Sequence, residues 1–563
     1  MPTLAYLVHQ NYKKNPEKIS IILQHVGHDD VYISYHDLVV GSARYARTYT
    51  SAGIKPGEVV VLILQHGVDL VYSFWGAILH GAIPTIMPFL TEKLSPERYR
   101  ADLAALISVT QPAAIVTYPE FESDIQSALT PDSSIRAVLL TSKLVPSAAP
   151  DFDQMQGLQC LPTDIVLLQH SSGTTGLQKG VALSHQAVLN QLDAYTRAIN
   201  LTDNDVLVSW LPLYHDMGLI AGFLMPILSG ITLVLISPFD WVRAPHKLFQ
   251  AVSRYRGTLS WLPNFAYNFC TQKVRDRDLE SVDLSTWRVI TNCSEPVKWE
   301  SHRAFYQRFK KYGLRETALN CSYAMAENVF GVTQTPLGTV PVTDEIDRES
   351  YINGRIAISP VDGKPSLWMM SSGRALHNTR ILILDENGKV LPDKVIGEIA
   401  LQSDYMLTSY YHRPDATEKA MRDGWYLTGD YGYTLNGEVF VTGRKKDMII
   451  VGGKNVYPQD LESLAYEVPG IHAGRAVAFG IEDAKAGTEE VVIVAEVDTD
   501  ETEERQKIAD ALRKHITQNS AVALRHAHVV GPKWILKTSS GKTARSANRE
   551  KFLQEMESER FVS

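Results

Sequence analysis

The sequence predicts an α/β protein in which roughly the first 330 residues form mostly parallel sheets flanked by helices. A β-rich segment and a small α+β domain are expected to follow. Short, continuous apolar runs alternate with longer helical patterns up to about residue 330, as in sheets covered on both faces. Two strand-like runs around an Asn387-Gly388 turn then indicate the β-rich segment, and the pattern changes again near Lys446.

The alternation can be followed element by element. It begins with a strand from Ile19, a helix over 36–51, a strand from Glu58 and a helix over 68–80, and further apolar runs start at 113, 136, 164 and 231. One stretch, Met217–Ser237, has no charge and is about as long as a membrane span. Because Pro226 and a Ser229-Gly230 pair interrupt it, we predict a buried helix, a turn and a buried strand, with no stable membrane insertion.

Composition excludes several classes of function. The 563 residues carry a formal charge of -8 without any basic block, so nucleic acid is not an expected partner. The four cysteines have no C-x-x-C spacing, which indicates neither a zinc site nor a disulfide framework. The first residues do not have the pattern of an export signal, and a cytoplasmic location is expected.

A glycine- and hydroxyl-rich stretch, SSGTTGLQKG (171–180), has the composition of a loop that binds phosphate through backbone N–H groups and hydroxyls. It follows a predicted strand over 164–169 and precedes a helix over 184–200 with a serine at its start. It does not match the P-loop pattern, because Lys179 precedes a glycine instead of following one. On composition alone, an ordinary turn is the more frequent explanation.

Five further stretches are richer in functional side chains than a packed core requires. They are WLPLYHDMG with His215, NCSEPV over 292–297, SYAMAEN over 322–328, WYLTGDYG with Asp430, and KTSSGK with Lys542. Two of them follow strand-like runs, and open α/β sheets bind ligands at the carboxyl ends of strands. Taken singly, each has an ordinary alternative: a core histidine, a surface turn or a solvated lysine.

In order and spacing these motifs resemble the adenylate-forming superfamily of acyl-CoA synthetases, luciferases and adenylation domains. SWLPLYHDMGLI, TLSWLPNFAYNFC, the Glu295-Pro296 pair and NVYPQDLE look most like the fatty acyl-AMP ligase branch. That branch has an insertion, which we place at about 340–370. His170, Cys293 and Ala324 depart from the usual pattern, although none replaces a charged catalytic group.

The resemblance implies a domain organisation. The large N-terminal domain, residues 1–445, would hold two helix-flanked, mostly parallel sheets to about 330, the insertion, and a small β-barrel subdomain over about 371–442. A small, mobile α+β domain over 446–563 would turn about a hinge at Lys446.

The resemblance also implies the site residues. Catalytic roles fall to Lys542, Glu327 and His215, and the metal ligands would be Glu327 and Thr175. The acyl pocket would be lined by Leu213, Met217, Gly218 and Phe265. The nucleotide would be bound by Ser171, Ser172, Gly173, Thr174, Thr175, Gly176, Lys179, Ser294, Glu295, Pro296, Tyr323, Ala324, Met325, Ala326, Asp430 and Arg444.

The implied reaction is ATP- and Mg²⁺-dependent adenylation of a fatty or related carboxylic acid. The acyl group would then pass to phosphopantetheine carried by an acyl carrier protein, and the enzyme is expected to be a monomer. Two alternatives remain at this point: an acyl-CoA ligase that uses coenzyme A, and a non-catalytic module that binds adenylates.

Overall fold

The computed structural model describes all residues except 1, 90–95, 146–151, 171–178, 452–453, 484–487, 521, 539–540 and 563. The chain forms two compact units. Unit 1 comprises residues 1–341, 373–380 and 402–424, and unit 2 comprises 342–372, 381–401 and 425–563. The domain boundary at Lys446 is expected because a hinge is predicted there. The division into two compact units does not test a hinge, so this boundary stays a prediction.

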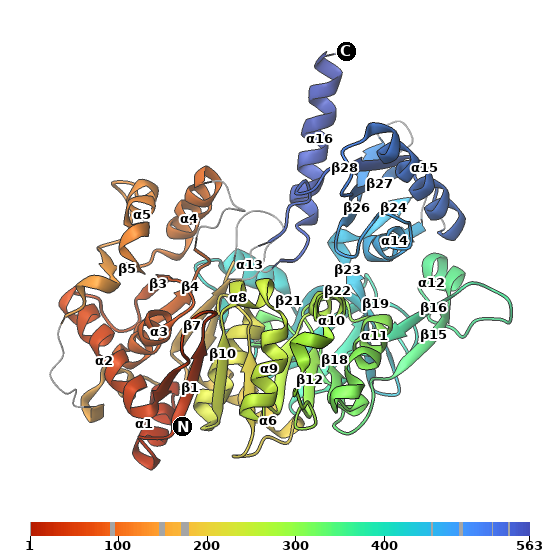
Figure 1. The fold of residues 1–563 in the computed structure, drawn as a ribbon. Helices are drawn as coiled ribbons and strands as arrows, with labels where there is room; N and C mark the ends of the chain where they lie inside the picture. The colour runs from red at the N-terminus through yellow and green to blue at the C-terminus, as the bar shows by residue number, and fades with distance from the viewer. Residues whose placement is uncertain are drawn as a thin grey trace. The chain divides into compact units, whose positions relative to one another are not determined.

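Unit 1 contains the predicted helix-flanked parallel sheets (Figure 1). The larger sheet has the strand order β13-β12-β11-β9-β10-β1-β2, and only β2 runs antiparallel to its neighbour. Its strands are β1 (Ile19–Gln24), β2 (Val31–Ser34), β9 (Val206–Ser209), β10 (Thr232–Ile236), β11 (Leu259–Leu262), β12 (Val289–Asn292) and β13 (Leu319–Cys321). The smaller parallel sheet, in the order β4-β3-β5-β6, comprises β3 (Val59–Ile63), β4 (Ile83–Ile86), β5 (Ala114–Thr117) and β6 (Ala137–Leu140).

The helices of unit 1 alternate with these strands, as the sequence predicts. Ser34 and Asp37 form a capping box that fixes the start of α2. The chain turns out of α3 at Gly81, whose φ of 87° favours glycine. The helices are α1 (Leu4–Lys14), α2 (Tyr35–Ser51), α3 (Val68–His80), α4 (Pro96–Thr110), α5 (Glu122–Ala128), α6 (His185–Ala198), α7 (Met225–Ser229), α8 (Pro238–Arg243), α9 (His246–Tyr255), α10 (Asn264–Lys273) and α11 (Trp299–Phe309).

The uncharged stretch after residue 217 is buried, as predicted. It forms a π-helix, η5 (Met217–Leu224), then α7, a turn at Gly230 and strand β10. All eight residues of η5 are buried in the core of unit 1. Among the described helices, none combines the length and apolarity needed to cross a membrane.

A three-stranded sheet frames the glycine-rich stretch. Strands β7 (Ile165–His170) and β8 (Gly180–Ser184) pair antiparallel on either side of it. Strand β20 (Ser409–Tyr410) pairs with β8 from more than two hundred residues away, Tyr410 lying opposite Val181. Unit 1 also contains β14 (Thr333–Gln334), paired with β17 (Arg374–Ala375), and α13 (Pro414–Ala420) followed by β21 (Met421–Arg422).

Unit 2 begins with the region where we predict the insertion. There β15 (Thr343–Asp347), α12 (Arg348–Gly354) and β16 (Ser366–Met370) form a hairpin with a helix. The β-rich segment contributes β18 (Thr379–Leu384), β19 (Gly397–Ser403), β22 (Trp425–Leu435) and β23 (Glu438–Arg444), with β22 antiparallel to both β19 and β23. Tyr351 of α12 packs in one core with Tyr433 and Phe440 of these strands and with Tyr457.

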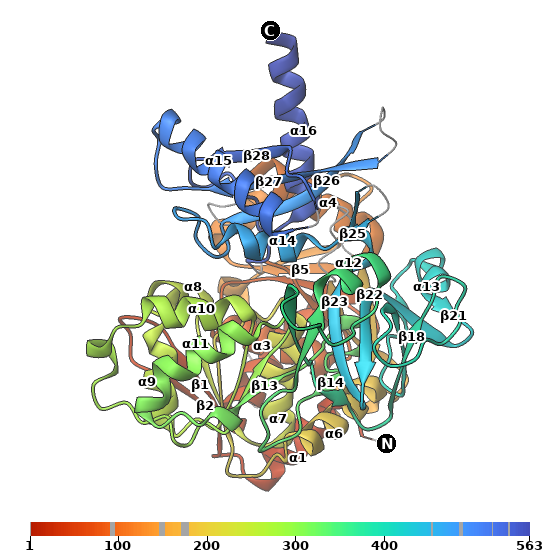
Figure 2. The same ribbon diagram turned by 90° about the vertical axis from the view of Figure 1, so that its right-hand side faces the viewer.

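The last part of unit 2 is the predicted α+β domain (Figure 2). Its sheet has the order β26-β27-β28, and its core lies between the strands and helices α14 and α15. The elements are β24 (Ile449–Val451), β25 (Lys454–Val456), α14 (Pro458–Ala465), β26 (Ala476–Asp483), β27 (Thr488–Glu496), α15 (Thr502–Asn519), β28 (His526–Val530) and α16 (Arg545–Val562).

Candidate active site

Four loops that carry predicted site residues leave neighbouring strands of the larger sheet. His215 follows β9, Phe265 follows β11, Glu295 follows β12 and Glu327 follows β13. Because these four strands are adjacent and parallel, their carboxyl ends meet at the same edge of the sheet. The structure therefore brings together motifs that are more than a hundred residues apart in the sequence.

Glu327 lies in a short 3₁₀ turn, η9 (Ala326–Asn328), and is held by a segment that the sequence reading did not single out. The hydroxyl of Tyr410 donates to Oε1 of Glu327 at 2.9 Å, and the N–H of Leu407 donates to the backbone carbonyl of Glu327 at 2.7 Å. Nζ of Lys179 lies 4.5 Å from the centroid of the Tyr410 ring. Tyr410 thus contacts both a predicted metal ligand and Lys179, the next-to-last residue of the glycine-rich stretch.

The surroundings of that stretch differ from the sequence prediction. We expected it to join a strand to a helix, but it joins the two strands of the hairpin β7–β8, and α6 starts only after β8. The predicted serine cap is confirmed, since Oγ of Ser184 accepts the N–H of Ala187 at 3.1 Å. Residues Ser171, Ser172, Gly173, Thr174, Thr175 and Gly176 lie outside the described residues.

His170 ends β7, immediately before the glycine-rich stretch. Burial lowers the pKa of His170 to about 4, because a charged imidazolium would lose its hydration there. The side chain is therefore neutral near pH 7, and the residue before the predicted phosphate loop contributes no positive charge.

The loop around Tyr323 is fixed by its own backbone. The side chain of Tyr323 is almost buried. The backbone N–H of Tyr323 donates to Oγ1 of Thr333 at 2.9 Å. Ala324 forms a bridge to Gly331, and the N–H of Met325 donates to Phe330 at 2.8 Å. Ala326 then enters the turn that carries Glu327.

His215 has a fixed orientation. Its Nδ1 lies 2.7 Å from Oδ1 of Asp216, and the same carboxylate oxygen accepts the N–H of Met217 at 2.7 Å. The carboxylate of Asp216 therefore orients the imidazole of His215 and also caps the start of the π-helix η5. Such a carboxylate–imidazole pair selects the tautomer with the proton on Nδ1 and leaves Nε2 as the acceptor.

Residues predicted for the nucleotide and for the acyl group meet at Met217. Its Sδ lies 2.9 Å from Sγ of Cys293 and 4.0 Å from Oγ of Ser294. Ser294 has a φ of 67°, so the chain turns sharply between Cys293 and the Glu295-Pro296 pair. The loop after β12 is therefore packed directly against the start of η5.

Phe265 is linked to the same loop. Its N–H donates to Oε2 of Glu295 at 2.9 Å, and its ring stands edge-on to two tryptophans, Trp210 and Trp241. These two indoles are buried and stacked, with centroids 3.5 Å apart. The predicted acyl-binding residue thus belongs to an aromatic wall, and Trp241 in that wall carried no sequence motif that would have identified it.

The remaining predicted acyl-pocket residues, Leu213 and Gly218, are buried. A Cβ on Gly218 would lie 2.3 Å from the carbonyl oxygen of Pro212, so this glycine is required for the close approach of η5 to the preceding loop. Close packing against Pro212 is therefore enough to explain why a glycine stands at position 218.

A buried polar network supports the loop after β12. Nδ2 of Asn292 contacts Oδ1 of Asn264 at 3.0 Å and Nε2 of His302 at 3.1 Å. Burial lowers the pKa of His302 to about 3, so its ring is neutral and can accept the amide hydrogen. The network ties the starts of α10 and α11 to the strand end that precedes Glu295.

Unit 2 contains the remaining predicted residues. Asp430 on β22 lies opposite Arg444 on β23, with Nε of Arg444 3.8 Å from Oδ1 of Asp430. Gly429 has a φ of 70°, and its N–H donates to Oε1 of Glu398 at 3.2 Å. Glu398 lies in an ordinary strand pattern on β19, and no motif in the sequence identifies it.

Glu398 also contacts the segment that was predicted to be the hinge. Nζ of Lys445 lies 2.9 Å from its Oε2, and this hydrogen bond raises the pKa of Lys445. Lys446 follows in the short turn η10 (Lys445–Asp447).

Lys542 lies on a hairpin that precedes α16. The N–H of Thr538 donates to the carbonyl of Lys542 at 2.7 Å, and Oγ1 of Thr538 accepts the N–H of Lys542 at 3.2 Å. Lys537 and Thr543 form a bridge between the two sides. The backbone of Lys542 is therefore hydrogen-bonded to Thr538 in both directions.

Comparisons with known proteins agree with this set of motifs. A model of the family described as AMP-binding enzyme matches residues 8–411. The medium-chain-fatty-acid–[acyl-carrier-protein] ligase JamA of Moorena producens is 28% identical over 97% of this chain and 94% of its own. The long-chain-fatty-acid–AMP ligase FadD32 of Mycobacterium marinum is 30% identical over 89% of this chain and 85% of its own.

Solved structures show the same likeness. A structure from work on fatty acyl-adenylate ligases of E. coli and L. pneumophila has a TM-score of 0.89 at 27% identity and covers 99% of both chains. A fatty acid AMP ligase from Legionella pneumophila has a TM-score of 0.73 at 27% identity, covering 98% of this chain and 96% of its own. The resemblance stated from the motifs is confirmed, and the chain belongs to the family of AMP-binding enzymes.

Proposed function

We propose that this enzyme activates a fatty or related carboxylic acid with ATP and passes the acyl group to the phosphopantetheine thiol of an acyl carrier protein. In the first step a carboxylate oxygen of the acid bonds to the α-phosphorus of ATP, and pyrophosphate leaves. In the second step the thiolate attacks the acyl carbon, AMP leaves, and a thioester remains. The relatives named as fatty acyl-AMP ligases and as an acyl-carrier-protein ligase support this assignment.

The observation that carries the proposal is the contact of Tyr410 with Glu327 and Lys179. The carboxylate of Glu327 and the ammonium of Lys179 both contact Tyr410, near the closing end of the glycine-rich stretch, and Glu327 lies in the loop after β13 that also carries Tyr323. Adenylation brings two anions together, so its catalysis depends on placed charges and positioning. This arrangement provides both kinds of charge at the phosphate end of the site.

The donor chemistry fits Mg²⁺. Magnesium is usually held by one or two carboxylates together with substrate phosphates. Glu327 offers such a carboxylate, and Tyr410 fixes one of its oxygens. Among the residues that the structure describes, no group of three or more His, Cys, Asp or Glu side chains could hold a metal without the nucleotide. Glu327 and Thr175 would hold the ion, which when bound neutralises charge on the phosphates.

The other residues take roles that follow from their positions. Tyr323 would stack on adenine, with Ser294, Glu295 and Pro296 beside it. Asp430 and Arg444, on paired strands, would bind the ribose, and His215, oriented by Asp216, would face the acyl phosphate. Lys542 would bridge the acid and the α-phosphate during adenylation.

The acyl chain would enter beside Met217 and Phe265. The aromatic wall of Trp210, Trp241 and Phe265 supplies apolar surface there, with Glu295 joining it to the nucleotide loop. We place the enzyme in the cytoplasm as a monomer.

The test is a pyrophosphate-release assay over fatty acids of graded length, with hydroxylamine trapping of acyl-AMP. We expect acid-dependent pyrophosphate release, and thioester formation with a phosphopantetheinylated carrier protein in preference to coenzyme A. Rapid acyl-CoA formation would assign the enzyme to the acyl-CoA ligases. No acid-dependent turnover across the series would support a non-catalytic adenylate-binding module.

Lys542→Ala supplies the internal control. It should abolish adenylation because no other group bridges the two anions in this proposal. Lys514→Ala, which removes the same charge from an exposed position on α15, should leave adenylation unchanged.

A further inference from the structure

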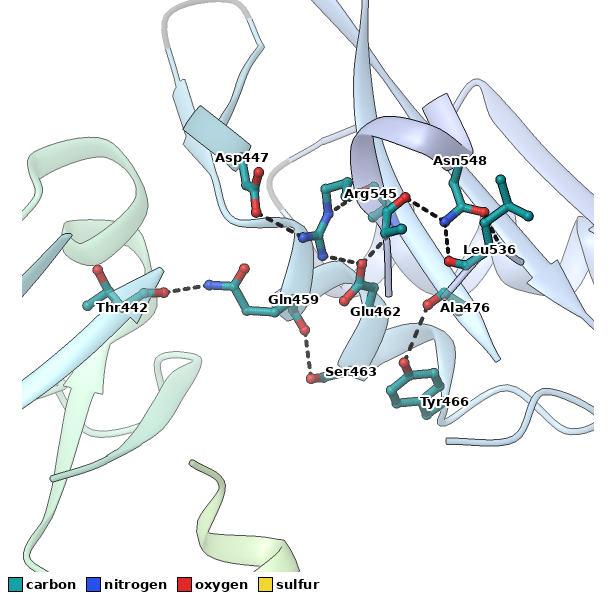
Figure 3. Close-up of polar contacts among 12 residues, drawn as sticks. Thr442, Asp447, Gln459, Glu462, Ser463, Tyr466, Ala476, Leu536, Arg545 and Asn548 are labelled. Carbon is teal, nitrogen blue, oxygen red and sulfur yellow. Dashed lines mark hydrogen bonds and ion pairs between the residues drawn. The ribbon is translucent and has the colours of Figure 1, made fainter. Parts of the chain in front are cut away.

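The guanidinium of Arg545 joins three separate parts of the C-terminal domain (Figure 3). Nε donates to the carbonyl of Ala478 on β26 at 2.8 Å. Nη2 lies 2.5 Å from Oε1 of Glu462 on α14, and Nη1 lies 3.2 Å from Oδ2 of Asp447 in η10. Three of its N–H groups are thus directed at three acceptors from different elements.

These partners are largely removed from water. The side chains of Arg545, Asp447 and Glu462 are 16%, 13% and 11% exposed, respectively. Oε1 of Glu462 also accepts the N–H of Ala478 at 2.9 Å. Burial by itself lowers the pKa of the Arg545 guanidinium. The negative charges of Glu462 and Asp447 have the larger combined effect, so the pKa lies above its usual range. The contact is therefore permanently charged and directional.

Arg545 stands at the first position of α16, three residues after Lys542. One turn further, Asn548 is fully buried and fixes the other side of the same hairpin: its amide accepts the N–H of Leu536 at 2.7 Å and donates to Leu536 and Ala544 at 2.8 Å each. The hairpin that carries Lys542 is therefore held at its base by Asn548 and is tied to the rest of the domain through Arg545.

The contacts of Arg545 all lie on one side of the predicted hinge. Asp447, Glu462 and Ala478 follow Lys446 in the chain, and Asp447 is the residue directly after it. By contrast, Nε2 of Gln459 donates to the carbonyl of Thr442, which precedes the hinge, at 2.5 Å (Figure 3). A turn at Lys446 would strain the contact of Gln459 while leaving those of Arg545 intact.

We propose that Arg545 is a positioning residue that couples the hinge segment to the Lys542 hairpin, so that a turn at Lys446 moves Lys542 as part of one rigid body. This rests on the proposed function, because it assigns Lys542 to adenylation and not to thioester transfer. The group that acts on substrate remains Lys542, and Arg545 acts through it.

The half-reactions separate this role from a merely structural one. Arg545→Lys keeps the charge but loses the planar fork, and Asp447→Asn removes the link to the hinge segment. A displacement of about 1 Å costs on the order of 100-fold in rate, so both variants should lower acyl-AMP formation by about tenfold or more. Transfer from purified acyl-AMP to the carrier protein should stay within about twofold, as for Lys542→Ala.

Arg549→Lys is the matched control, since Arg549 is exposed one turn further along α16. It should change neither half-reaction. The inference is overturned if Arg545→Lys and Asp447→Asn adenylate at the wild-type rate, or if they slow both half-reactions equally, which would indicate a general loss of folding.

Amide hydrogen exchange gives a readout that does not depend on activity. In Arg545→Lys and Asp447→Asn, the amides of 536–538 and 541–544 should exchange at least about threefold faster than in wild type, with those of β27 unchanged. Unchanged exchange of the hairpin would refute the coupling even in an inactive protein. Absence of acyl-AMP formation by wild type, with the exchange result as expected, would instead refute the proposed function alone.

Discussion

Replacing Tyr410 by phenylalanine tests the contact on which the proposed function depends. The substitution removes the hydroxyl that donates to Glu327 at 2.9 Å but keeps the ring beneath Lys179. A hydrogen bond to a charged group contributes about 1.5–3 kcal/mol. Since each 1.36 kcal/mol corresponds to about a tenfold change in rate, adenylation should fall by roughly 10- to 150-fold.

The assay is acyl-AMP formation over a titration of Mg²⁺. Because Tyr410 fixes the carboxylate proposed to hold the ion, the Mg²⁺ concentration for half-maximal rate should rise together with the fall in rate. Tyr411→Phe is the neighbouring control, since that ring stacks on His412 and lies outside the Glu327 contact. Wild-type rates for Tyr410→Phe at every Mg²⁺ concentration, or an equal loss in Tyr411→Phe, would refute the reasoning.

Three further predictions concern orientation, packing and pH. Asp216→Asn should lower the adenylation rate about tenfold or more with little change in melting temperature, because it loosens His215; an unchanged rate would exclude the orienting role. Gly218→Ala should lower the free energy of unfolding by about 1–3 kcal/mol in urea titrations, since its Cβ would meet Pro212, whereas a stable variant would contradict the close approach. Burial lowers the pKa of His185 to about 4, and its Nδ1 accepts the N–H of Leu4. The unfolded chain takes up this proton near pH 6.5 and the folded chain only near 4. Stability should therefore fall by ~3 kcal/mol as pH drops through that window, and His185→Asn should remove this share of the slope.

Much of the fold could be predicted because local patterns determine it. The alternation of apolar runs and helices, the start of α6 at Ser184 and the interruption of the stretch after Met217 all reflect nearby residues. The strand-end positions of Glu295 and Glu327 could be predicted for the same reason, since each follows a recognisable buried run.

The errors and omissions have a common cause, which is pairing between distant segments. Strand β8 is only five residues long and precedes a capped helix, so its pairing with β7 was not apparent in the local pattern. Tyr410 lies 83 residues from Glu327, and nothing around it indicates that contact. The stacking of Trp241 on Trp210 likewise depends on tertiary structure alone.

The order in which the chain visits the two units has a consequence for synthesis. Residues 402–424 return to unit 1 only after two segments of unit 2 have been made. Strand β20, which borders β8 and supplies Tyr410, is in this last excursion. A nascent chain can therefore form both parallel sheets while the end of the site near Glu327 is still incomplete. The core of unit 1 also receives Tyr410 and Ala416 from this last segment, so a chain cut short before residue 409 would lack part of that core as well as the tyrosine that holds Glu327.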